Sequence, residues 1–492
     1  MESDEKRTTE SQARTDCVLL VPPILKYASG PLLGPAILDA VANLAGLAVK
    51  VVDANIEFLR STTLLPEPEV PPPFYGDHAK GLLVLQASEA RFWGHVLPAF
   101  STGANELSRI RNGWYSHQEL VSAIENLSEA GLGRFLRQAL VTRPSPRVFG
   151  VSVMWSGQVV AGALASKIAR QTWPGVRIVW GGAHITAIAK EVATDRKFSQ
   201  WMDGALPGHC EQSFVDLLAS GNRFGCKGLI IPGCGIPQRS VVPMVPPPAP
   251  KFSDLESYGY PILTLPVELS VGCAYAKCTF CTYPATEGAY RSFPLKSLEQ
   301  VVKLADGKGA AVSLKDSLVT APLLRTVAAV VRGRVSWSAC TKLSWALNSE
   351  LLNFIAANGC RTLEIGLESL LDETQRRIDK VQSSALLDNF LKSARDARLS
   401  VVVNYMTGFP WEDEREATRT LRELERHLAS MRGLVYRVEH NTFNLERLSP
   451  MATFPAKFGV KVTRAWPWAS VLEWSRVPYQ LQGDAIPLEG AG

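Results

Sequence analysis

The sequence predicts an α/β protein in which two series of parallel strands and covering helices follow one another. Three observations predict this class. Short apolar runs alternate with segments whose apolar residues recur at helical spacing. The 492 residues include 46% apolar and 20% charged residues, as soluble globular proteins do. A proline-rich stretch over 243–252 separates the two series and predicts an extended linker. A chain of this length can hold two or three domains with full cores.

The first series predicts a Rossmann-like parallel sheet over residues 16–242, with a proline-rich and then helical insert over about 64–140. The expected strands are Cys17–Val21, Val49–Asp53, Val148–Ser152 and Arg177–Trp180, and the expected helices span 31–46 and 159–173. Ligands of such sheets bind beyond the carboxyl ends of the strands. The candidate loops there are 22–34, 152–157, 181–186 and 206–211.

Composition and termini limit the classes of partner and compartment. No run of about 18 uncharged apolar residues occurs, so we expect no membrane span. Residues 1–15 are polar and lack the apolar core of a signal peptide, and we expect a disordered tail there. The net charge of +5 is mild and no basic block stands out, which disfavours nucleic acid as a partner. Nine cysteines without scaffold spacing favour a reducing cytoplasm.

Three cysteines, Cys273, Cys278 and Cys281, lie within nine residues, just after an apolar run over 260–271. Thiolates are soft ligands that select zinc, copper(I) or iron–sulfur clusters. A [4Fe–4S] cube normally takes four thiolates, so three would leave one iron open to bind a small molecule. A structural zinc site would normally add a second cysteine pair or nearby histidines, and Cys234 is the nearest other candidate. Three unrelated buried thiols are the remaining interpretation.

The segment from Gly272 to Cys281 resembles the cluster loop of the radical S-adenosylmethionine (SAM) superfamily, whose pattern is C-x3-C-x-aromatic-C. Phe280 stands at the aromatic position, whereas four residues rather than three separate Cys273 from Cys278. The resemblance implies a [4Fe–4S] cluster on the three cysteines and SAM bound to its open iron. It further implies a 5′-deoxyadenosyl radical that removes a hydrogen atom from an unactivated carbon. An electron donor such as a flavodoxin or ferredoxin is the implied partner.

Strand–helix units after this loop resemble the partial (β/α)6 barrel of the same superfamily, here over residues 253–432. The expected strands are 311–315, 335–339, 362–367 and 401–406, and the expected helices are 295–304, 321–331, 348–358 and 384–397. Barrel active sites lie at the carboxyl ends of the strands. The resemblance of these strand ends to SAM-binding motifs implies SAM contacts from Phe280, Asp316, Glu368, Ser369, Asn404 and Gly408. Alternatively, Glu368 is a helix N-terminal charge.

The first series resembles the cobalamin-binding domain that precedes many radical SAM domains. The order and spacing of its strand-end motifs imply cobalamin contacts from Ser152, Gly181, Gly182, His184, Thr186, Gly208 and Glu211. Because D-x-H-x-x-G is absent, the resemblance implies no protein histidine on the lower face of cobalt. A ligand-free Rossmann-like domain stays open, and so does a loop-packing role for His184. A nicotinamide site is disfavoured, since the first strand-to-helix turn lacks G-x-G-x-x-G.

Residues 433–492, with Trp466, Trp468 and Trp474, resemble the C-terminal portion of cobalamin-type radical SAM enzymes that act on ribosomally made peptides. Such tryptophans also pack into domain interfaces. We therefore expect a cobalamin-dependent radical SAM C-methyltransferase with a peptide or small-molecule substrate. Two other functions stay open: non-methylating radical chemistry such as cyclisation, crosslinking or oxidation, and a non-catalytic binding protein with a vestigial cluster. The helical insert caps the cobalamin or helps to bind a peptide in this interpretation.

Overall fold

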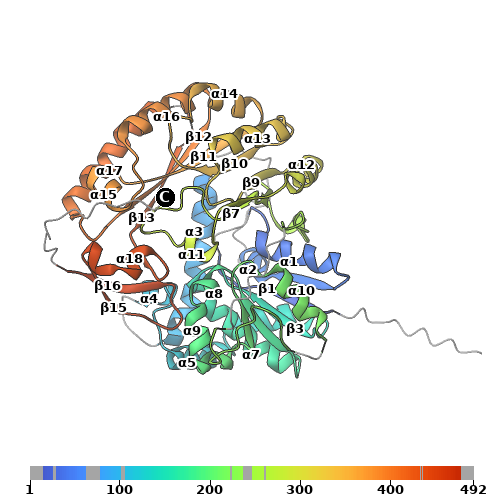
Figure 1. Cartoon of the computed structure of the whole chain (residues 1–492). Coiled ribbons are helices and arrows are strands. Elements are labelled where there is room, and N and C mark those ends of the chain that lie inside the picture. Colours follow the sequence, from blue (N-terminus) through green and yellow to red (C-terminus); the bar gives the residue numbers. More distant parts are fainter. Residues whose placement is uncertain are drawn as a thin grey trace, which may run out of the picture.

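The computed structural model confirms the α/β class, with two parallel sheets and a small C-terminal region beside both (Figure 1). It describes residues 15–25, 29–61, 78–100, 106–221, 224–236, 246–259, 262–432, 434 and 436–477. Residues 1–14 of the expected tail, the start of the insert and residues 243–245 of the linker lie outside this part. The domain bounds stay predictions. Among the described residues, no helix combines the length and apolar character needed to cross a bilayer.

The first sheet has five parallel strands in the order β2-β1-β3-β4-β5. They are β1 (Cys17–Val21), β2 (Val49–Asp53), β3 (Val148–Ser152), β4 (Arg177–Gly181) and β5 (Gly204–Leu206). β1 is buried on both faces, because Val18 and Leu20 enter one core cluster and Cys17 and Leu19 enter another. This explains its continuous apolar run. The strand order reverses between β1 and β3, where ligands of doubly wound sheets bind.

Helices cover both faces of this sheet, and the helical insert is part of the covering layer. The helices are α1 (Leu33–Leu44), α2 (Ala54–Ser61), α3 (His78–Val96), α4 (Glu106–Arg111), α5 (His117–Leu127), α6 (Gly131–Val141), α7 (Val159–Thr172), α8 (Ala183–Ala187), α9 (Ala189–Thr194) and α10 (Glu211–Ala219). α5 and α6 pack against α7, and Trp93 and Tyr115 are buried in the core. The described part of the insert therefore completes the core of the first sheet.

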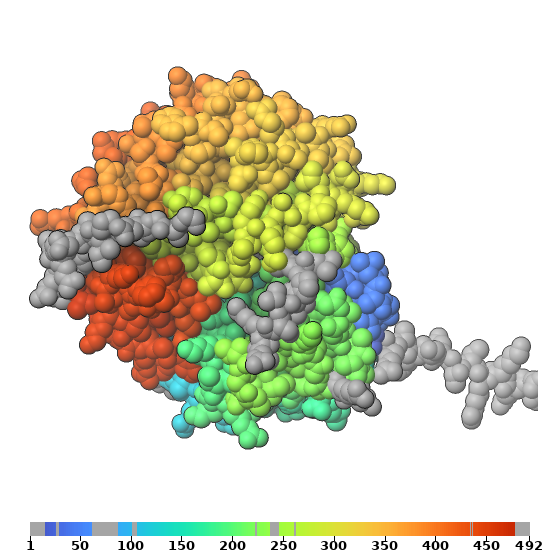
Figure 2. All heavy atoms as spheres, in the orientation of Figure 1, coloured from blue at the N-terminus to red at the C-terminus, as the bar shows by residue number. Residues whose placement is uncertain are grey.

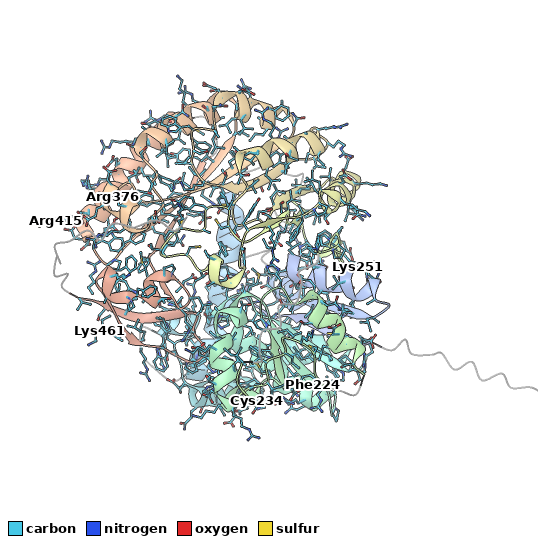
Figure 3. The ribbon with its side chains drawn as sticks, viewed as in Figure 1. Phe224, Cys234, Lys251, Arg376, Arg415 and Lys461 are labelled. Carbon is cyan, nitrogen blue, oxygen red and sulfur yellow. The ribbon has the colours of Figure 1, made fainter. Side chains whose placement is uncertain are left out.

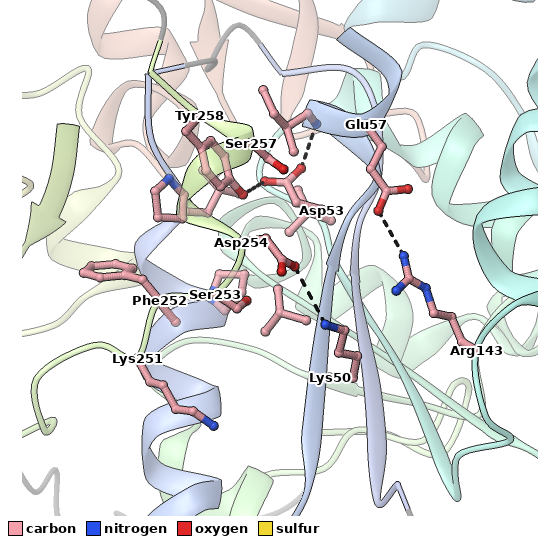
Figure 4. A pocket seen from close by; sticks show the side chains of 17 residues that line it. Lys50, Asp53, Glu57, Arg143, Lys251, Phe252, Ser253, Asp254, Ser257 and Tyr258 are labelled. Atoms are coloured by element: carbon pink, nitrogen blue, oxygen red, sulfur yellow. Dashed lines mark hydrogen bonds and ion pairs between the residues drawn. The ribbon is translucent and has the colours of Figure 1, made fainter. Parts of the chain in front are cut away.

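Residues 251–258, which follow the proline-rich stretch, are fastened to the outer edge of the first sheet. Lys251 N donates to Ala36 O (3.0 Å), and Tyr258 Oη donates to Asp53 Oδ2 (2.7 Å). Figure 4 shows the polar cavity of about 250 Å³ between this segment, α1 and β2. Its charged side chains pair with one another, as Lys50 does with Asp254 (3.8 Å) and Arg143 with Glu57 (3.1 Å). We interpret the cavity as part of the interface between the segment over 251–258 and the first sheet.

A further contact between the two sheets lies at the start of the second sheet. Thr264 N donates to Ser29 O (2.7 Å) in the loop after β1. A Cβ atom added at Gly30 would lie 1.8 Å from Thr264 O, so only glycine permits this approach. The loop after β1 is thereby tied to the first strand of the second sheet.

The second sheet has six parallel strands in the order β13-β12-β11-β10-β9-β6, the open arrangement of a partial (β/α)6 barrel. They are β6 (Thr264–Val267), β9 (Ala311–Leu314), β10 (Trp337–Thr341), β11 (Cys360–Glu368), β12 (Ser400–Thr407) and β13 (Tyr436–Thr442). The helices α12 (Lys296–Lys308), α13 (Ala321–Val331), α14 (Ser349–Ala357), α15 (Asp372–Arg377), α16 (Ser384–Asp396) and α17 (Glu414–Leu428) cover its outer face (Figure 1).

The C-terminal region contains the antiparallel sheet β14-β16-β15. Its elements are β14 (Leu445–Glu446), α18 (Pro450–Thr453), β15 (Val460–Arg464) and β16 (Val471–Arg476). Trp468, between β15 and β16, is fully buried in the core of the first sheet. Its ring centroid lies 4.3 Å from that of Phe198, 5.4 Å from His117 and 6.0 Å from Trp180. The region thus joins the two sheets, and its surface touches both in the space-filling view (Figure 2).

Candidate functional site

The cysteine loop lies between the two sheets (Figure 1). The short pair β7 (Ser270–Val271) and β8 (Arg291–Ser292) closes the loop, and helix α11 (Tyr283–Thr286) lies within it. Gly272, just before the first cysteine, has a φ of 69°, and a Cβ atom there would lie 2.6 Å from Gly288 O. Glycine is therefore required where the strand turns into the loop.

The three cysteines are free thiols of intermediate exposure. Burial raises the pKa of Cys278 to about 11 and that of Cys281 to about 12, and the charge of Cys273 raises both. Cys281 N donates to Cys278 O (3.2 Å), so a tight turn holds these two cysteines close together. By contrast, Cys234 is exposed and lies among the elements of the first sheet (Figure 3).

The spacing of the three thiols bears on which metal group the loop could hold. Among the described residues, no three side chains of His, Cys, Asp or Glu lie close enough together to hold one ion. Thiolates that bind different irons of a [4Fe–4S] cube need not converge on one point, so this spacing is compatible with a cluster. Within the longer spacer, Ala276 takes a left-handed φ of 51°, a turn that folds the extra residue back into the loop.

Glu368, the expected ribose contact, ends β11 with a left-handed φ of 68°. Its Oε1 accepts a hydrogen bond from Lys380 Nζ at 2.5 Å, and both side chains are buried. A Cβ atom at Gly366 would lie 2.5 Å from this Nζ and 2.6 Å from this Oε1, so the glycine makes room for the pair. The sequence analysis missed Lys380, because no motif marks it.

Two further SAM candidates lie near this pair or inside the barrel. The ring of Phe280 lies 5.8 Å from Lys380 Nζ and packs against the core of the C-terminal region. Asn404 Nδ2 donates to Glu364 Oε1 (2.7 Å) from the neighbouring strand. The Glu364 charge also opposes the effect of burial, which lowers the pKa of Lys315. The interior of the barrel is therefore polar and charged.

The remaining SAM candidates make structural contacts. Asp316 is 3% exposed, and its Oδ1 accepts from Leu269 N (3.1 Å) and Ser270 Oγ (2.6 Å). Its carboxylate therefore anchors the backbone at the start of β7 and does not lie on an open surface. Ser369 Oγ accepts from Leu371 N (3.1 Å) just before α15. Gly408 has a φ of 83°, and its N–H donates to Glu412 Oε2 (2.6 Å). The roles of these residues toward SAM stay predictions.

Most of the expected cobalamin residues meet at the carboxyl edge of the first sheet. Ser152 ends β3 and Gly181 ends β4. Gly182 has a φ of 100°, and a Cβ atom there would lie 2.4 Å from Val153 O. Thr186 Oγ1 accepts from Gly208 N (2.8 Å), which ties the loop after β4 to the loop after β5. Glu211 begins α10, with its Oε1 3.7 Å from His209 Nδ1.

His184 lies beneath this edge and is only 2% exposed. Its Nδ1 is 3.4 Å from Ser156 Oγ, and the backbone of Trp468 lies beside the ring. Burial lowers the pKa of His184 to about 4, so the imidazole is neutral. This geometry favours the loop-packing interpretation. Trp155, in contrast, is 57% exposed in the loop after β3, and the sequence analysis did not single it out.

The edge of the first sheet and the cysteine loop face each other. Helix α11 of the loop contacts α8, which follows the Gly181-Gly182 turn. At the same junction, burial raises the pKa of Glu268 to about 8, and the charge of His209 opposes that rise while those of Glu211 and Glu287 add to it. Ionisable residues from both halves of the chain thus meet at this junction.

Comparison with known proteins agrees with this arrangement. A sequence profile of the radical SAM superfamily matches residues 267–424. An uncharacterized methyltransferase from Pyrococcus horikoshii is 23% identical over 309 residues, which are 58% of this chain. The match spans 65% of that relative, just under two thirds of its length.

Two solved structures share the fold across nearly the whole chain. The radical SAM methyltransferase TsrM from Kitasatospora setae, solved with cobalamin and a [4Fe–4S] cluster, has a TM-score of 0.58 and 15% identity, and the match covers 92% of this chain and 81% of TsrM. The cobalamin-dependent SAM radical enzyme OxsB, solved with aqua-cobalamin, has a TM-score of 0.61 and 12% identity, and the match covers 94% of this chain and 65% of OxsB. At these identities the likeness concerns the fold. Residues 267–424 of this chain therefore match the radical SAM superfamily, and the chain as a whole has the fold that TsrM and OxsB share.

Proposed function

We propose that this chain is a cobalamin-dependent methyltransferase that transfers a methyl group to an unactivated carbon of a ribosomally made peptide natural product. The observation that carries the proposal is the contact between α8 and α11. It brings the carboxyl edge of the first sheet, where doubly wound folds bind ligands, against the cysteine loop at the mouth of the barrel.

The three cofactors have distinct sites in this proposal. Cys273, Cys278 and Cys281 hold the [4Fe–4S] cluster, SAM binds beside Glu368 and Phe280, and cobalamin lies on the loops after β3, β4 and β5. When bound, the cluster and SAM supply a radical that removes a hydrogen atom, and cobalamin supplies the methyl carrier. TsrM, solved with cobalamin and a [4Fe–4S] cluster, and OxsB, solved with aqua-cobalamin and SAM, support this set.

The chain's own residues bind and shield the acceptor. Lys315, Glu364 and Asn404 line a polar barrel interior and orient the acceptor by hydrogen bonds. The C-terminal region closes one side, because Arg447 Nη1 donates to Glu191 Oε1 (2.8 Å) of the first unit. A closed, water-poor space protects a radical from side reactions.

The resemblance of the tryptophan-containing C-terminal region supports a peptide acceptor. A small molecule is the other acceptor class, since TsrM was solved with tryptophan as substrate. A flavodoxin or ferredoxin as electron donor and a cytoplasmic location complete the proposal.

The test is turnover by the anaerobically reconstituted holoenzyme with a low-potential reductant and a precursor peptide encoded beside its gene. Mass spectrometry of the peptide is expected to show the gain of one methyl group. 5′-Deoxyadenosine and S-adenosylhomocysteine are expected to accumulate in step with it. A product that has lost two hydrogens, formed without S-adenosylhomocysteine, would replace methylation by the non-methylating alternative. Absence of 5′-deoxyadenosine would favour the binding protein.

A second experiment tests the cobalamin site by itself. Electron paramagnetic resonance (EPR) of the cobalt(II) form is expected to show no nitrogen splitting from a protein histidine, since His184 is only 2% exposed and its ring lies beside the backbone of Trp468. Nitrogen splitting in protein loaded with a cobinamide, which carries no nucleotide base, would contradict the expectation. Failure of the first sheet to bind cobalamin would reduce it to a scaffold.

A further inference from the structure

A buried lysine lies directly behind the cysteine loop and takes no part in the function proposed so far. Lys380 Nζ is 2.5 Å from Glu368 Oε1 and 5.8 Å from the centroid of the Phe280 ring. Its side chain is 11% exposed and that of Glu368 is 10% exposed. Lysine is almost never buried to this extent unless it is paired.

The backbone around Lys380 is built against the cysteine loop. Thr279 N donates to Ile378 O (3.0 Å), and Tyr275 Oη donates to Asp379 O (2.8 Å). Thr279 Oγ1 also donates to the carbonyl oxygen of residue 377 (2.9 Å). Three hydrogen bonds therefore fix residues 377–379 against the cysteine loop, and Lys380 is the next residue in the chain.

The fold stabilises an unfavourable backbone to hold this lysine. Asp379 and Val381, on either side of it, have φ values of 51° and 50°. A left-handed conformation is strained for a β-branched residue such as valine. Two buried glutamine amides counter the strain from the end of β11: Gln375 Nε2 donates to Leu367 O (2.7 Å), and Gln382 Nε2 donates to Gly366 O (2.5 Å).

A purely structural salt bridge does not explain this arrangement well. Taking two charges out of water is costly, and a buried pair often contributes little to stability compared with apolar residues. Strain stored in the backbone is characteristic of functional positions. Burial opposes the raised pKa of Lys380, whereas Glu368 raises it most, followed by Cys278 and Cys340. Of these, Cys278 belongs to the cysteine loop.

We propose that Lys380 is a positioning residue of the iron–sulfur site, whose ammonium offsets the negative charge of the thiolate-bound cluster and fixes Glu368 beside it. The inference rests on the proposed function, because it requires the cluster. A nearby cation stabilises the reduced, more negative cluster, since cluster potentials follow the charge and hydrogen bonding around the sulfurs. The pair Lys380–Glu368 then sets the potential through two opposite charges.

The experiment is an EPR-monitored redox titration of reconstituted protein, with the iron content of each sample measured alongside. Lys380→Met is expected to shift the midpoint potential of the cluster to more negative values, and Lys380→Arg to restore it largely. Glu368→Gln is expected to shift the potential in the opposite direction, because it removes the negative partner. Lys461→Met, which removes an exposed cation of β15 (Figure 3), is the matched control with an unchanged potential.

The outcomes separate this inference from the function on which it rests. An unchanged potential in Lys380→Met with a full iron content overturns the inference alone. Shifts of the same sign in Lys380→Met and Glu368→Gln also overturn it, since a general distortion would then explain both. If Lys380→Met loses its iron, the sign of the shift in Glu368→Gln decides. A parent protein that binds no iron overturns the cluster itself, and with it the proposed function.

Discussion

Replacement of Asp316 by alanine distinguishes a structural role of this carboxylate from a role in binding SAM. Burial raises the pKa of Asp316, and the hydrogen bonds from Ser270 Oγ and Leu269 N oppose that rise. Both donors lie at the start of β7, immediately before the cysteine loop. We expect Asp316→Ala to loosen this strand and the loop that follows it.

The magnitude follows from the two donors that lose their acceptor. A buried donor left without a partner costs about 1–3 kcal/mol. Because the Ser270 hydroxyl can rotate toward another acceptor, we expect about 2–4 kcal/mol in total rather than the full sum. This corresponds to about 30- to 1,000-fold more frequent opening of the strand. Asp316→Asn keeps one acceptor oxygen, and we expect its free-energy cost to be about half that of Asp316→Ala.

Hydrogen exchange measured by mass spectrometry tests this expectation locally. A peptide covering residues 264–272 is expected to exchange faster in Asp316→Ala, while a peptide covering β3 serves as the internal control. Iron retention should fall together with the protection of the first peptide. Unchanged exchange combined with weaker binding of SAM would refute the structural role and assign Asp316 to the SAM site.

Three further predictions concern the cluster, acid stability and the C-terminal region. Joint replacement of Cys273, Cys278 and Cys281 by alanine is expected to abolish both bound iron and SAM cleavage, and four irons per chain retained in that variant would exclude these ligands. Burial lowers the pKa of His184 in the folded protein from its ordinary value of 6.5 to about 4. The neutral imidazole therefore contributes fully to stability above pH 6.5, and this contribution is lost as the pH falls toward 4. The free energy of unfolding is expected to fall by up to about 3 kcal/mol over this range. Denaturant unfolding at pH 7 and pH 4.5 should show a smaller fall in this free energy for His184→Asn than for the parent protein. Trp468→Ala is expected to lower the free energy of unfolding by about 3–5 kcal/mol, whereas Trp468→Phe should cost far less; equal losses in a urea titration would contradict this.

The sequence predicts much of the fold because its strands are buried. β1, β2 and β3 have the predicted bounds. β1 and β3 are buried throughout, and a strand covered on both faces must be apolar along its whole length. β13 was not predicted, because Tyr436–Thr442 lies at the edge of the second sheet and is mostly polar or exposed. The apolar run over 260–271 contains two strands, β6 and β7, and Leu269 N between them donates a hydrogen bond to Asp316 Oδ1.

Local sequence patterns mark only part of the candidate site. The spacing of the cysteines and the Gly181-Gly182 turn are such patterns, and the structure places them in one region. Lys380 was missed because its place depends on left-handed backbone conformations at Asp379 and Val381, which neither residue type signals in a sequence. The ring of His184 lies beside the backbone of Trp468, which is 284 residues later in the chain, so no window of local sequence contains this contact.

The position of Trp468 also bears on how this chain acquires its structure during synthesis. The first sheet precedes the barrel in the sequence, and domains generally fold as units from the N-terminal side. Yet one aromatic side chain of its core leaves the ribosome only after every strand of the barrel. Until then, Phe198, Trp180 and His117 surround a gap in the core, and contacts of such long range are slow to close. A ribosome-bound chain that ends before residue 466 should therefore bind chaperones through this gap, and release should follow the addition of the last strands.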